Sequence, residues 1–293
     1  MPSGILLLDK PLGLSSNAVL QRVKHLLGAR KAGHVGSLDP LASGMLPIVL
    51  DEATKIAGEI LSRRKCYRFT LALGARTRTG DTEGAIVETL PVPPLARADV
   101  DRVFAGFRGV SLQLPPMFSA LKQGGQPLYA LARAGIEVDR KPREIEILCL
   151  EPVAIGPSSL EAEVVCSKGT YVRTLGEDIA VKLGTCGHLA GLRRLYVEPF
   201  AGEPMTTLDA LEAALAGDRA PALLAPDAAL GHLPAVEVAP DAVARLRHGQ
   251  AVGVAGAELA PVLRLYGPDQ RFIGLGSCEE RGIVQPRRLL ADS

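Results

Sequence analysis

The chain has 293 residues, of which 47% are hydrophobic, and it carries a formal net charge of +1. That length suits one large domain with a small one, and the composition supplies enough apolar side chains for a sizeable core. No apolar run approaches the roughly 18–20 residues that a membrane-spanning helix needs. The opening MPSGILLLDKP lacks the basic segment and the long apolar run of a secretory signal, so a cytoplasmic protein is expected.

Cysteine and histidine usage gives no sign of a metal site. The cysteines are far apart, and no two of them form a C-x-x-C pair. The histidines show no H-E-x-x-H motif and no other metal-ligand spacing. Reduced thiols and no bound metal are therefore predicted, rather than disulfides or zinc. The cysteines are Cys66, Cys149, Cys166, Cys186 and Cys278.

Charge is distributed unevenly along the chain. Residues 1–80 hold twelve lysines and arginines and five acidic residues, whereas residues 203–241 hold one arginine and seven acidic residues. A basic N-terminal part favours a polyanion such as nucleic acid as the partner. On charge alone, an ordinary mixed surface remains an equal alternative.

Four elements are expected in the first 62 residues. Apolar residues recur at helical spacing from Val19 to Leu27, after Ser16 and before Gly28, which can end a helix. A glycine-rich loop, GHVGSLDPLASG, then leads into the apolar run MLPIVL. The expected elements are a strand at ILLLD, a helix over 16–27, a strand over 45–50 and a helix around 52–61.

The middle of the chain is predicted to be a β framework with a basic excursion. Apolar residues at every second position from Tyr67 to Leu73 predict a strand, and AIVETL predicts its return after the turn TRTGDTEG. A helix is expected over 97–107. Residues 115–145 form a long excursion with a short helix near 127–134, which is typical of a binding flap. Its basic residues are Lys122, Arg133, Arg140, Lys141 and Arg143.

The last part of the chain contains one strand-to-helix junction, and its sequence pattern then changes to short strands and turns. A strand over 160–166 is followed by a helix that ends at Gly184, which places Tyr171 and Arg173 at the junction. HLAGLRRLYVEPF predicts a further strand. An alanine- and proline-rich stretch then supplies one helix and a linker. From about residue 233 only short strands and turns are expected.

Asp39 is the one charged residue of the glycine-rich loop. There is no phosphate-binding G-x-x-x-x-G-K-[ST] motif and no G-x-S-x-G nucleophile elbow in the chain. Pro40 biases Asp39 toward an extended backbone, and the glycines permit close approach. By residue type alone, an aspartate in such a loop is most often an Asx-turn.

The loop GHVGSLDPLASGMLP strongly resembles the signature around the catalytic aspartate of the TruB family of tRNA pseudouridine synthases. Further segments resemble that family in the same order along the chain: LLLDKPLGLSS, KCYRFTLALGARTRTGDTEG with Arg78 where an aspartate is common, PPMFSALKQGGQPLYALARAGIEVDRKPREIEI, CSKGTYVRTLGEDIAVKLG and HLAGLRRLYVEPF. The resemblance spans nearly all of residues 5–200. The C-terminal stretch is similar to the small PUA-like domain of bacterial members.

The resemblance implies the fold, the domains and the reaction. The fold would be α/β (α+β), a mixed curved sheet flanked by helices with a basic RNA-binding insertion. Residues 1–230 would form the catalytic domain, with the insertion at about 115–145, and residues 233–293 a PUA-like RNA-binding domain. The reaction would isomerise uridine to pseudouridine within RNA. Because it is redox-neutral and transfers no group from outside, no cofactor is expected.

The resemblance also implies roles for single residues. Asp39 would be the catalytic carboxylate, and Arg173 would pair with it and lower its pKa. A uridine in a folded loop must be flipped out to be reached, and Tyr67 would stack on the flipped ring. Tyr171 and Leu192 would line the nucleotide pocket. The remaining implied RNA contacts are His34 with displaced nucleotides, and Lys10, residues 16–27 and residues 115–145 with phosphates.

The implied substrate is the uridine numbered 55 in the TΨC loop of tRNA, with the PUA-like domain touching the acceptor arm. A monomer that needs no protein partner and no membrane is expected. Two alternatives stay open. One is an RNA chaperone, alone or beside the enzyme activity, which would need the basic surfaces but not Asp39. The other is the guide-RNA-dependent relative of archaea and eukaryotes, which shares these motifs.

Overall fold

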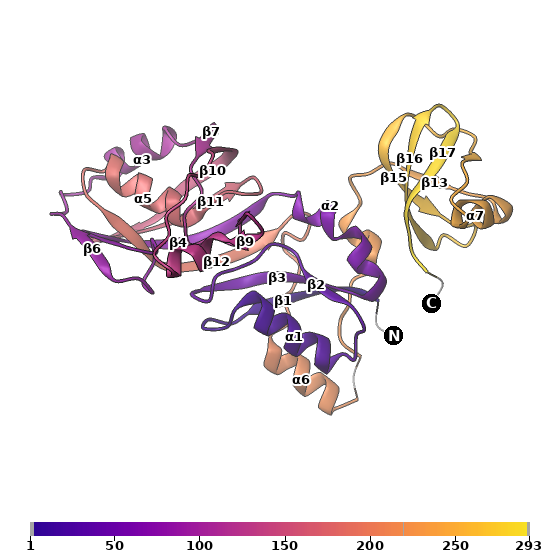
Figure 1. Ribbon diagram of the computed structural model, residues 1–293, viewed down its shortest axis with the longest axis horizontal. Coiled ribbons are helices and arrows are strands. Elements are labelled where there is room, and N and C mark those ends of the chain that lie inside the picture. The colour runs from indigo at the N-terminus through magenta and orange to yellow at the C-terminus, as the bar shows by residue number, and fades with distance from the viewer. Residues whose placement is uncertain (1–2, 219, 292–293) are drawn as a thin grey trace.

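The computed structural model describes residues 3–218 and 220–291. Figure 1 shows an elongated molecule in which a large mixed sheet with helices occupies one part and a small β-rich domain the other. The sheet has eight strands in the order β1-β3-β12-β4-β11-β10-β7, with β2 added beside β3. This confirms the predicted mixed sheet flanked by helices. No helix in the described ranges is long and apolar enough to cross a membrane.

The predicted elements of the large part are present in their predicted order, together with further strands that were not predicted. They are β1 (Gly4–Lys10), α1 (Ser16–Leu26), β2 (Ala32–His34), β3 (Ala42–Leu50), the 3-10 helix η1 (Asp51–Ile56), α2 (Ala57–Leu61), β4 (Lys65–Leu73), β5 (Ala75–Thr77), β6 (Ile86–Thr89), α3 (Arg97–Ala105), β7 (Gly109–Gln113), β8 (Lys122–Gln123), β9 (Gln126–Pro127), α4 (Leu128–Arg133), β10 (Arg143–Ile155), β11 (Ser159–Cys166), α5 (Val172–Lys182), β12 (Gly187–Val197) and α6 (Leu208–Ala216).

Helix α1 forms where its sequence signals place it. The hydroxyl of Ser15 accepts a hydrogen bond from the backbone N–H of Ala18 at 3.1 Å and so caps the first turn. Val19 and Val23, four residues apart, are buried against the sheet. Gly28 follows the helix with a φ of 59°, a left-handed conformation that glycine adopts most easily. Capping and periodicity together therefore fix the helix ends.

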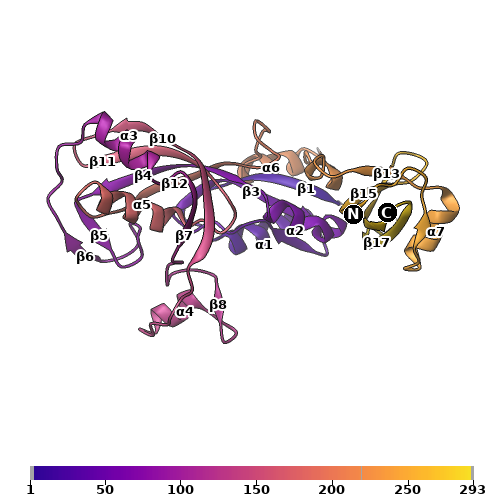
Figure 2. The ribbon, with the colours of Figure 1, turned by 90° about the horizontal axis from the view of Figure 1, so that it is seen from above.

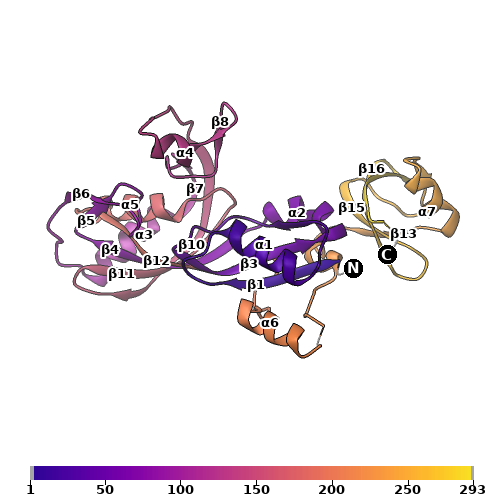
Figure 3. The same cartoon turned by 60° about the horizontal axis from the view of Figure 1, so that its bottom comes forward.

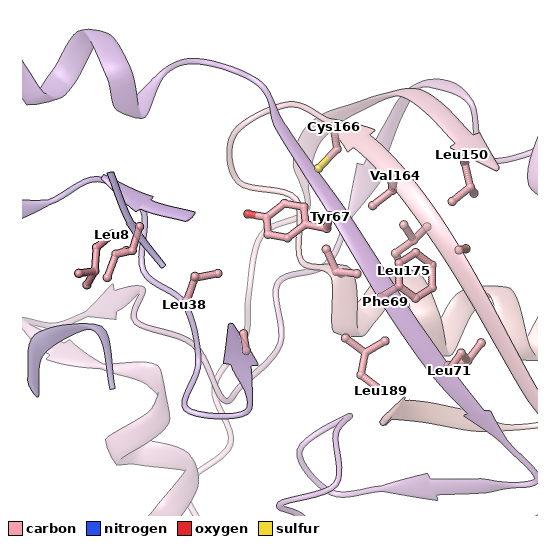
Figure 4. Close-up of a cluster of buried hydrophobic side chains, with 14 of the residues drawn as sticks. Leu8, Leu38, Tyr67, Phe69, Leu71, Leu150, Val164, Cys166, Leu175 and Leu189 are labelled. Atoms are coloured by element: carbon pink, nitrogen blue, oxygen red, sulfur yellow. The ribbon is translucent and has the colours of Figure 1, made fainter. Parts of the chain in front are cut away.

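The main core lies between the central strands and α5. Phe69 and Leu71 of β4 lie on the same face, as the alternation predicts, and meet Leu175 of α5 and Leu189 of β12 in one buried cluster (Figure 4). Tyr67 is on the same face at the end of this cluster. Tyr67, which the resemblance implies would stack on the flipped ring, is thus held at the edge of a packed core.

The insertion leaves the sheet as an arm. Figures 2 and 3 show α4 with the β8–β9 hairpin projecting from the strands β7 and β10 that carry it. The predicted short helix near 127–134 is therefore confirmed as α4. The backbone of Leu128 donates to the carbonyl of Leu121, and that of Tyr129 to Ser119, which closes the arm on itself.

The small domain has its own sheet and core. Its elements are β13 (Ala235–Glu237), α7 (Pro240–Arg247), β14 (Val252–Gly253), β15 (Ala260–Tyr266), β16 (Phe272–Glu280) and β17 (Ile283–Leu289), preceded by the 3-10 helix η2 (Pro226–Ala229). The strand order is β13-β15-β16-β17-β14. The expectation of strands and turns alone was wrong, because α7 is present and buries Ala242 and Leu246. Pro240 in its first turn and the four-residue apolar spacing were the available signals.

Gly44 of β3 is where the sheet is packed most tightly. Its φ is 99°, and an added Cβ would lie 2.1 Å from the carbonyl oxygen of Arg194 on β12. We predict that Gly44→Ala lowers the free energy of unfolding by about 2 kcal/mol or more, measured by urea denaturation. Gly28→Ala is the matched control, because its φ is also positive but its Cβ would meet open space. Gly28→Ala should lower the free energy of unfolding by only about 1 kcal/mol. Equal costs at the two glycines would contradict the steric argument.

Candidate active site

The loop with Asp39 connects β2 to β3 and is tied to α1. The hydroxyl of Ser16 accepts a hydrogen bond from the backbone N–H of Leu38 at 2.7 Å and lies 2.8 Å from the carbonyl oxygen of Leu38, to which it donates. Within the described residues, the Asp39 carboxylate accepts no hydrogen bond from its own loop. The Asx-turn that residue type alone favours is therefore not formed, and the carboxylate is free to face the neighbouring strands.

Arg173, in the first turn of α5, is the partner of Asp39. Its side chain is about 6% exposed, and its Nη2 lies 3.1 Å from Oδ2 of Asp39. Its Nη1 lies 3.5 Å from Oδ2 of Asp81, whose side chain is also buried. The guanidinium further donates to the carbonyls of Thr79 at 2.8 Å and Phe118 at 2.6 Å. The structure thus brings Asp39 and Arg173 together, and holds the arginine in one orientation.

The charges near Asp39 shift the pKa of its carboxyl in opposite directions. The Asp39 side chain is 43% exposed, and its partial burial raises the pKa of its carboxyl above the ordinary value, as does the Asp81 carboxylate. Arg173 and Lys10 lower it. The pairing with Arg173 lowers the pKa as expected, yet the net direction is upward because burial outweighs the cation.

A cavity of about 450 Å³ opens beside the ion pair. Five of the six residues that the sequence singled out line it, namely Asp39, Tyr67, Tyr171, Arg173 and Leu192. They come from a loop, two adjacent strands and a strand-to-helix junction. Leu192 of β12 is paired with Phe69 of β4, and Gln113 of β7 holds the Tyr171 backbone through its amide at 2.8 and 3.1 Å.

His34 is the sixth residue and does not line the cavity. It lies at the end of β2, where it pairs with Ile48 of β3. Burial lowers the pKa of its imidazole, and Arg194 lowers it further. Its Nδ1 atom is buried without a hydrogen-bond partner.

Three charged residues of the site were not predicted from the sequence. Asp81 was assigned only to a turn, and Lys65 and Arg194 to strands. Lys65 is 5% exposed, and its Nζ donates to the carbonyls of Leu61 at 2.7 Å and Arg63 at 2.5 Å. The available signal was the alternation of β4, since Lys65 lies two residues before Tyr67 and so faces the same side.

Arg194 joins the Asp39 loop to Tyr67. It is 1% exposed, and its side chain donates to the carbonyls of Met45 at 2.6 Å and Gly36 at 2.9 Å. Its guanidinium carbon lies 6.0 Å from the centre of the Tyr67 ring. A Cβ on Gly36 would lie 3.2 Å from Arg194, and Gly44 faces the Arg194 backbone. Gly36 of the loop and Gly44 of β3 therefore make room for Arg194.

The assignment of Lys10 to RNA phosphates was wrong. Lys10 is completely buried, and its Nζ donates to the carbonyls of Pro11 at 2.8 Å and Leu14 at 2.6 Å. Burial lowers its pKa to about 8, against the raising effect of Asp39. A lysine held in this way contributes positive potential to the site without reaching the surface. Among the described residues, no group of three potential metal ligands is present.

Comparison with known proteins gives matches over almost the whole chain. The family model described as "TruB family pseudouridylate synthase (N terminal domain)" matches residues 24–172. A model of the tRNA pseudouridylate synthase B C-terminal domain matches residues 173–226, and one of the pseudouridine synthase II TruB C-terminus matches residues 234–290. The chain belongs to the TruB family of pseudouridylate synthases.

Relatives and solved structures agree with this family. A tRNA pseudouridine synthase B from Chromohalobacter salexigens is 47% identical over 98% of this chain and 94% of that protein. One from Methylobacillus flagellatus is 46% identical over 98% and 95%. An H/ACA RNP structure with a substrate RNA contains a chain of the same fold, with a TM-score of 0.74 and 23% identity over 99% of this chain and 85% of that one. A chain of a Cbf5–Nop10–Gar1 complex has a TM-score of 0.73 and 25% identity, over 99% and 84%.

The raised pKa of Asp39 predicts a stability effect. An acid whose pKa is higher in the folded protein than in the unfolded chain destabilises the fold once it ionises. This penalty is absent below the unfolded pKa and complete above the folded one. We predict that the urea midpoint of Asp39→Asn, relative to that of the wild type, rises as the pH rises through the range where Asp39 ionises.

The urea measurement needs a control in which a carboxylate far from the cavity is removed. Asp209→Asn, in the exposed first turn of α6, removes a carboxylate remote from the cavity and should not raise the midpoint. A relative midpoint of Asp39→Asn that stays constant or falls as the pH rises through that range would contradict the electrostatic account.

Proposed function

We propose that the chain isomerises a uridine of tRNA to pseudouridine at position 55 in the TΨC loop, with Asp39 as the reacting carboxylate. The observation that carries the proposal is the ion pair of Asp39 with the buried Arg173, at the wall of a cavity that Tyr67 and Leu192 also line. Family membership supports the reaction, and the name tRNA pseudouridine synthase B of the relatives supports tRNA as substrate. The position in tRNA rests on the TruB resemblance alone.

The residues that line the cavity have different proposed roles in the reaction. Arg173 lowers the pKa of the half-exposed Asp39 carboxyl and so favours its ionised form, against the raising effects of burial and Asp81. The flipped uridine would stack on Tyr67, with Leu192 and Tyr171 beside it, and stacking returns about 1–3 kcal/mol per base. After the glycosidic bond breaks, the ring turns within the cavity and bonds to the same sugar carbon through C5. No redox step or outside group is needed, so no cofactor is proposed.

The surrounding surfaces would hold the rest of the RNA. The arm of α4 and the β8–β9 hairpin carries Lys122 and Arg133, and its root at residues 119–121 lines the cavity, which supports phosphate contacts from the arm. His34 would contact displaced nucleotides from outside the cavity. The domains are proposed as residues 1–230, with the insertion at about 115–145, and a PUA-like RNA-binding domain at 233–293. The separate sheets and cores of the two parts support this division.

The proposed working unit is a cytoplasmic monomer that needs neither guide RNA nor a protein partner. A tRNA-folding chaperone role is a second proposal, which the arm favours because it projects from the sheet and does not depend on the carboxylate. Refolding of tRNA by the Asp39→Asn protein would separate this role from the chemistry.

The catalytic proposal predicts the behaviour of Asp39→Asn. The purified wild-type protein, without cofactor or guide RNA, should form carbodiimide-detectable pseudouridine in the TΨC loop of a tRNA transcript. Asp39→Asn should form none, because an amide cannot replace the reacting carboxylate. Its affinity for the transcript should stay within about threefold of wild type.

Two results would count against the proposal. Absence of product with the wild-type protein at any uridine would refute the enzyme activity. Loss of tRNA binding together with activity in Asp39→Asn would assign Asp39 a structural role. Asp209→Asn is the matched control for loss of a carboxylate.

The stacking role predicts different results for two substitutions of Tyr67. Tyr67→Phe keeps an aromatic face and should retain most of the single-turnover rate. Tyr67→Leu loses the stacking, and at about 1–3 kcal/mol per base kcat/KM should fall by about 5–150-fold. An equal loss in both variants would show that the hydroxyl, and not the ring, is needed.

A further inference from the structure

Two buried cations border the cavity without a counter-charge. Lys65 of β4 and Arg194 of β12 both line it and are 5% and 1% exposed. Tyr67 lies between them in the sheet, since it is two residues from Lys65 and is paired with Arg194. Lys65 donates to the backbone carbonyls of Leu61 and Arg63, and Arg194 donates to those of Met45 and Gly36. Among the described residues, no carboxylate lies within ion-pair distance of either cation.

The neighbours of Lys65 make its charge unfavourable in the free protein. Burial, together with the nearby cations Arg194 and Lys168 and against the opposing effect of Glu198, lowers the pKa of Lys65 to about 8. Burying a charge that has no counter-ion is expensive. Such an arrangement is common where a site is prepared for charge that arises later.

The proposed reaction supplies that charge inside the cavity. When the bond between the ribose C1′ and the uracil N1 breaks, its electron pair stays with the ring. The ring is then a uracil anion with one negative charge spread over its nitrogen and oxygen atoms. C5 next bonds to C1′, the C5 proton is released and N1 takes up a proton, so that product and substrate are isomers. The electron pair goes to the ring whichever atom Asp39 reacts with.

We propose that Lys65 and Arg194 stabilise the uracil anion after the glycosidic bond breaks. This inference rests on the proposed function. The carbonyls of Leu61, Arg63, Met45 and Gly36 fix both cations before the reaction, so that little reorganisation is needed when the charge develops. Arg194 also contacts the Asp39 loop and Tyr67, so replacing it would disturb the structure of the site as well as its charge. Lys65 is therefore the better residue for testing the effect of charge.

The test compares Lys65→Met, Lys65→Arg and the control Lys182→Met, at an exposed residue at the end of α5. Single-turnover rates are measured on a tRNA transcript, and dissociation constants are measured at several salt concentrations in the Asp39→Asn background. Lys65→Met should slow pseudouridine formation on the order of 10²-fold, in line with the loss of one preorganised donor. Its dissociation constant should change by less than about threefold, and Lys65→Arg should recover most of the rate.

A pH profile gives a readout that a structural role would not affect. In the wild-type protein, kcat/KM should fall above about pH 8 as Lys65 loses its proton, whereas Lys65→Arg should show no fall there. Lys10, with a pKa also near 8, is present in both proteins and so cannot account for a difference between them. If Lys65→Met does not fold, this comparison of wild type with Lys65→Arg decides the matter.

Several results would overturn the inference. Weaker tRNA binding by Lys65→Met with a smaller salt dependence and an unchanged rate would indicate a phosphate contact instead. A rate loss in Lys65→Arg equal to that in Lys65→Met, or no loss in either, would leave only a structural role. A wild-type protein that forms no pseudouridine would refute the proposed function and is recognised before any variant is compared.

Discussion

The guanidinium of Arg173 holds three distant segments of the chain at one point. It pairs with Asp39 of the glycine-rich loop, with Asp81 and the Thr79 carbonyl of a turn, and with the Phe118 carbonyl at the root of the insertion. A buried arginine must satisfy its donors in this way, because an unpaired cation in the protein interior is costly. The arm proposed to hold RNA is therefore hydrogen-bonded to the same group that orients the reacting carboxylate.

Strand β12 provides the second half of this arrangement. It runs parallel to β3 and antiparallel to β4, so that Leu192 and Arg194 face the cavity between the Asp39 loop and Tyr67. The close approach of β12 to β3 at Gly44 leaves no space for a side chain there. The loop thus packs against the sheet. Its charged neighbours Arg173 and Arg194 belong to regular elements, α5 and β12.

The sequence predicted most elements but only part of the site. Alternation placed Tyr67 on a buried face, and capping with helical periodicity placed α1 and α5, because these signals are local. The residues alone favoured a turn-forming Asp39, and its proposed role came from the resemblance. Lys65 and Arg194 were not predicted, since a charged residue in a strand usually faces solvent, although the alternation of β4 places Lys65 on the same side as Tyr67. The carbonyl partners of Arg194, on Met45 and Gly36, lie far away in the sequence and become its neighbours only in the folded chain.

The central claim is that the cavity beside Asp39 receives a flipped uridine. Its most direct test is the structure of the protein bound to a TΨC stem-loop with 5-fluorouridine at the target position. The account predicts the fluorinated ring inside the cavity, stacked on Tyr67 and within reach of the Asp39 carboxylate. A target base that remains stacked within the RNA loop, or one bound away from Asp39, would contradict it.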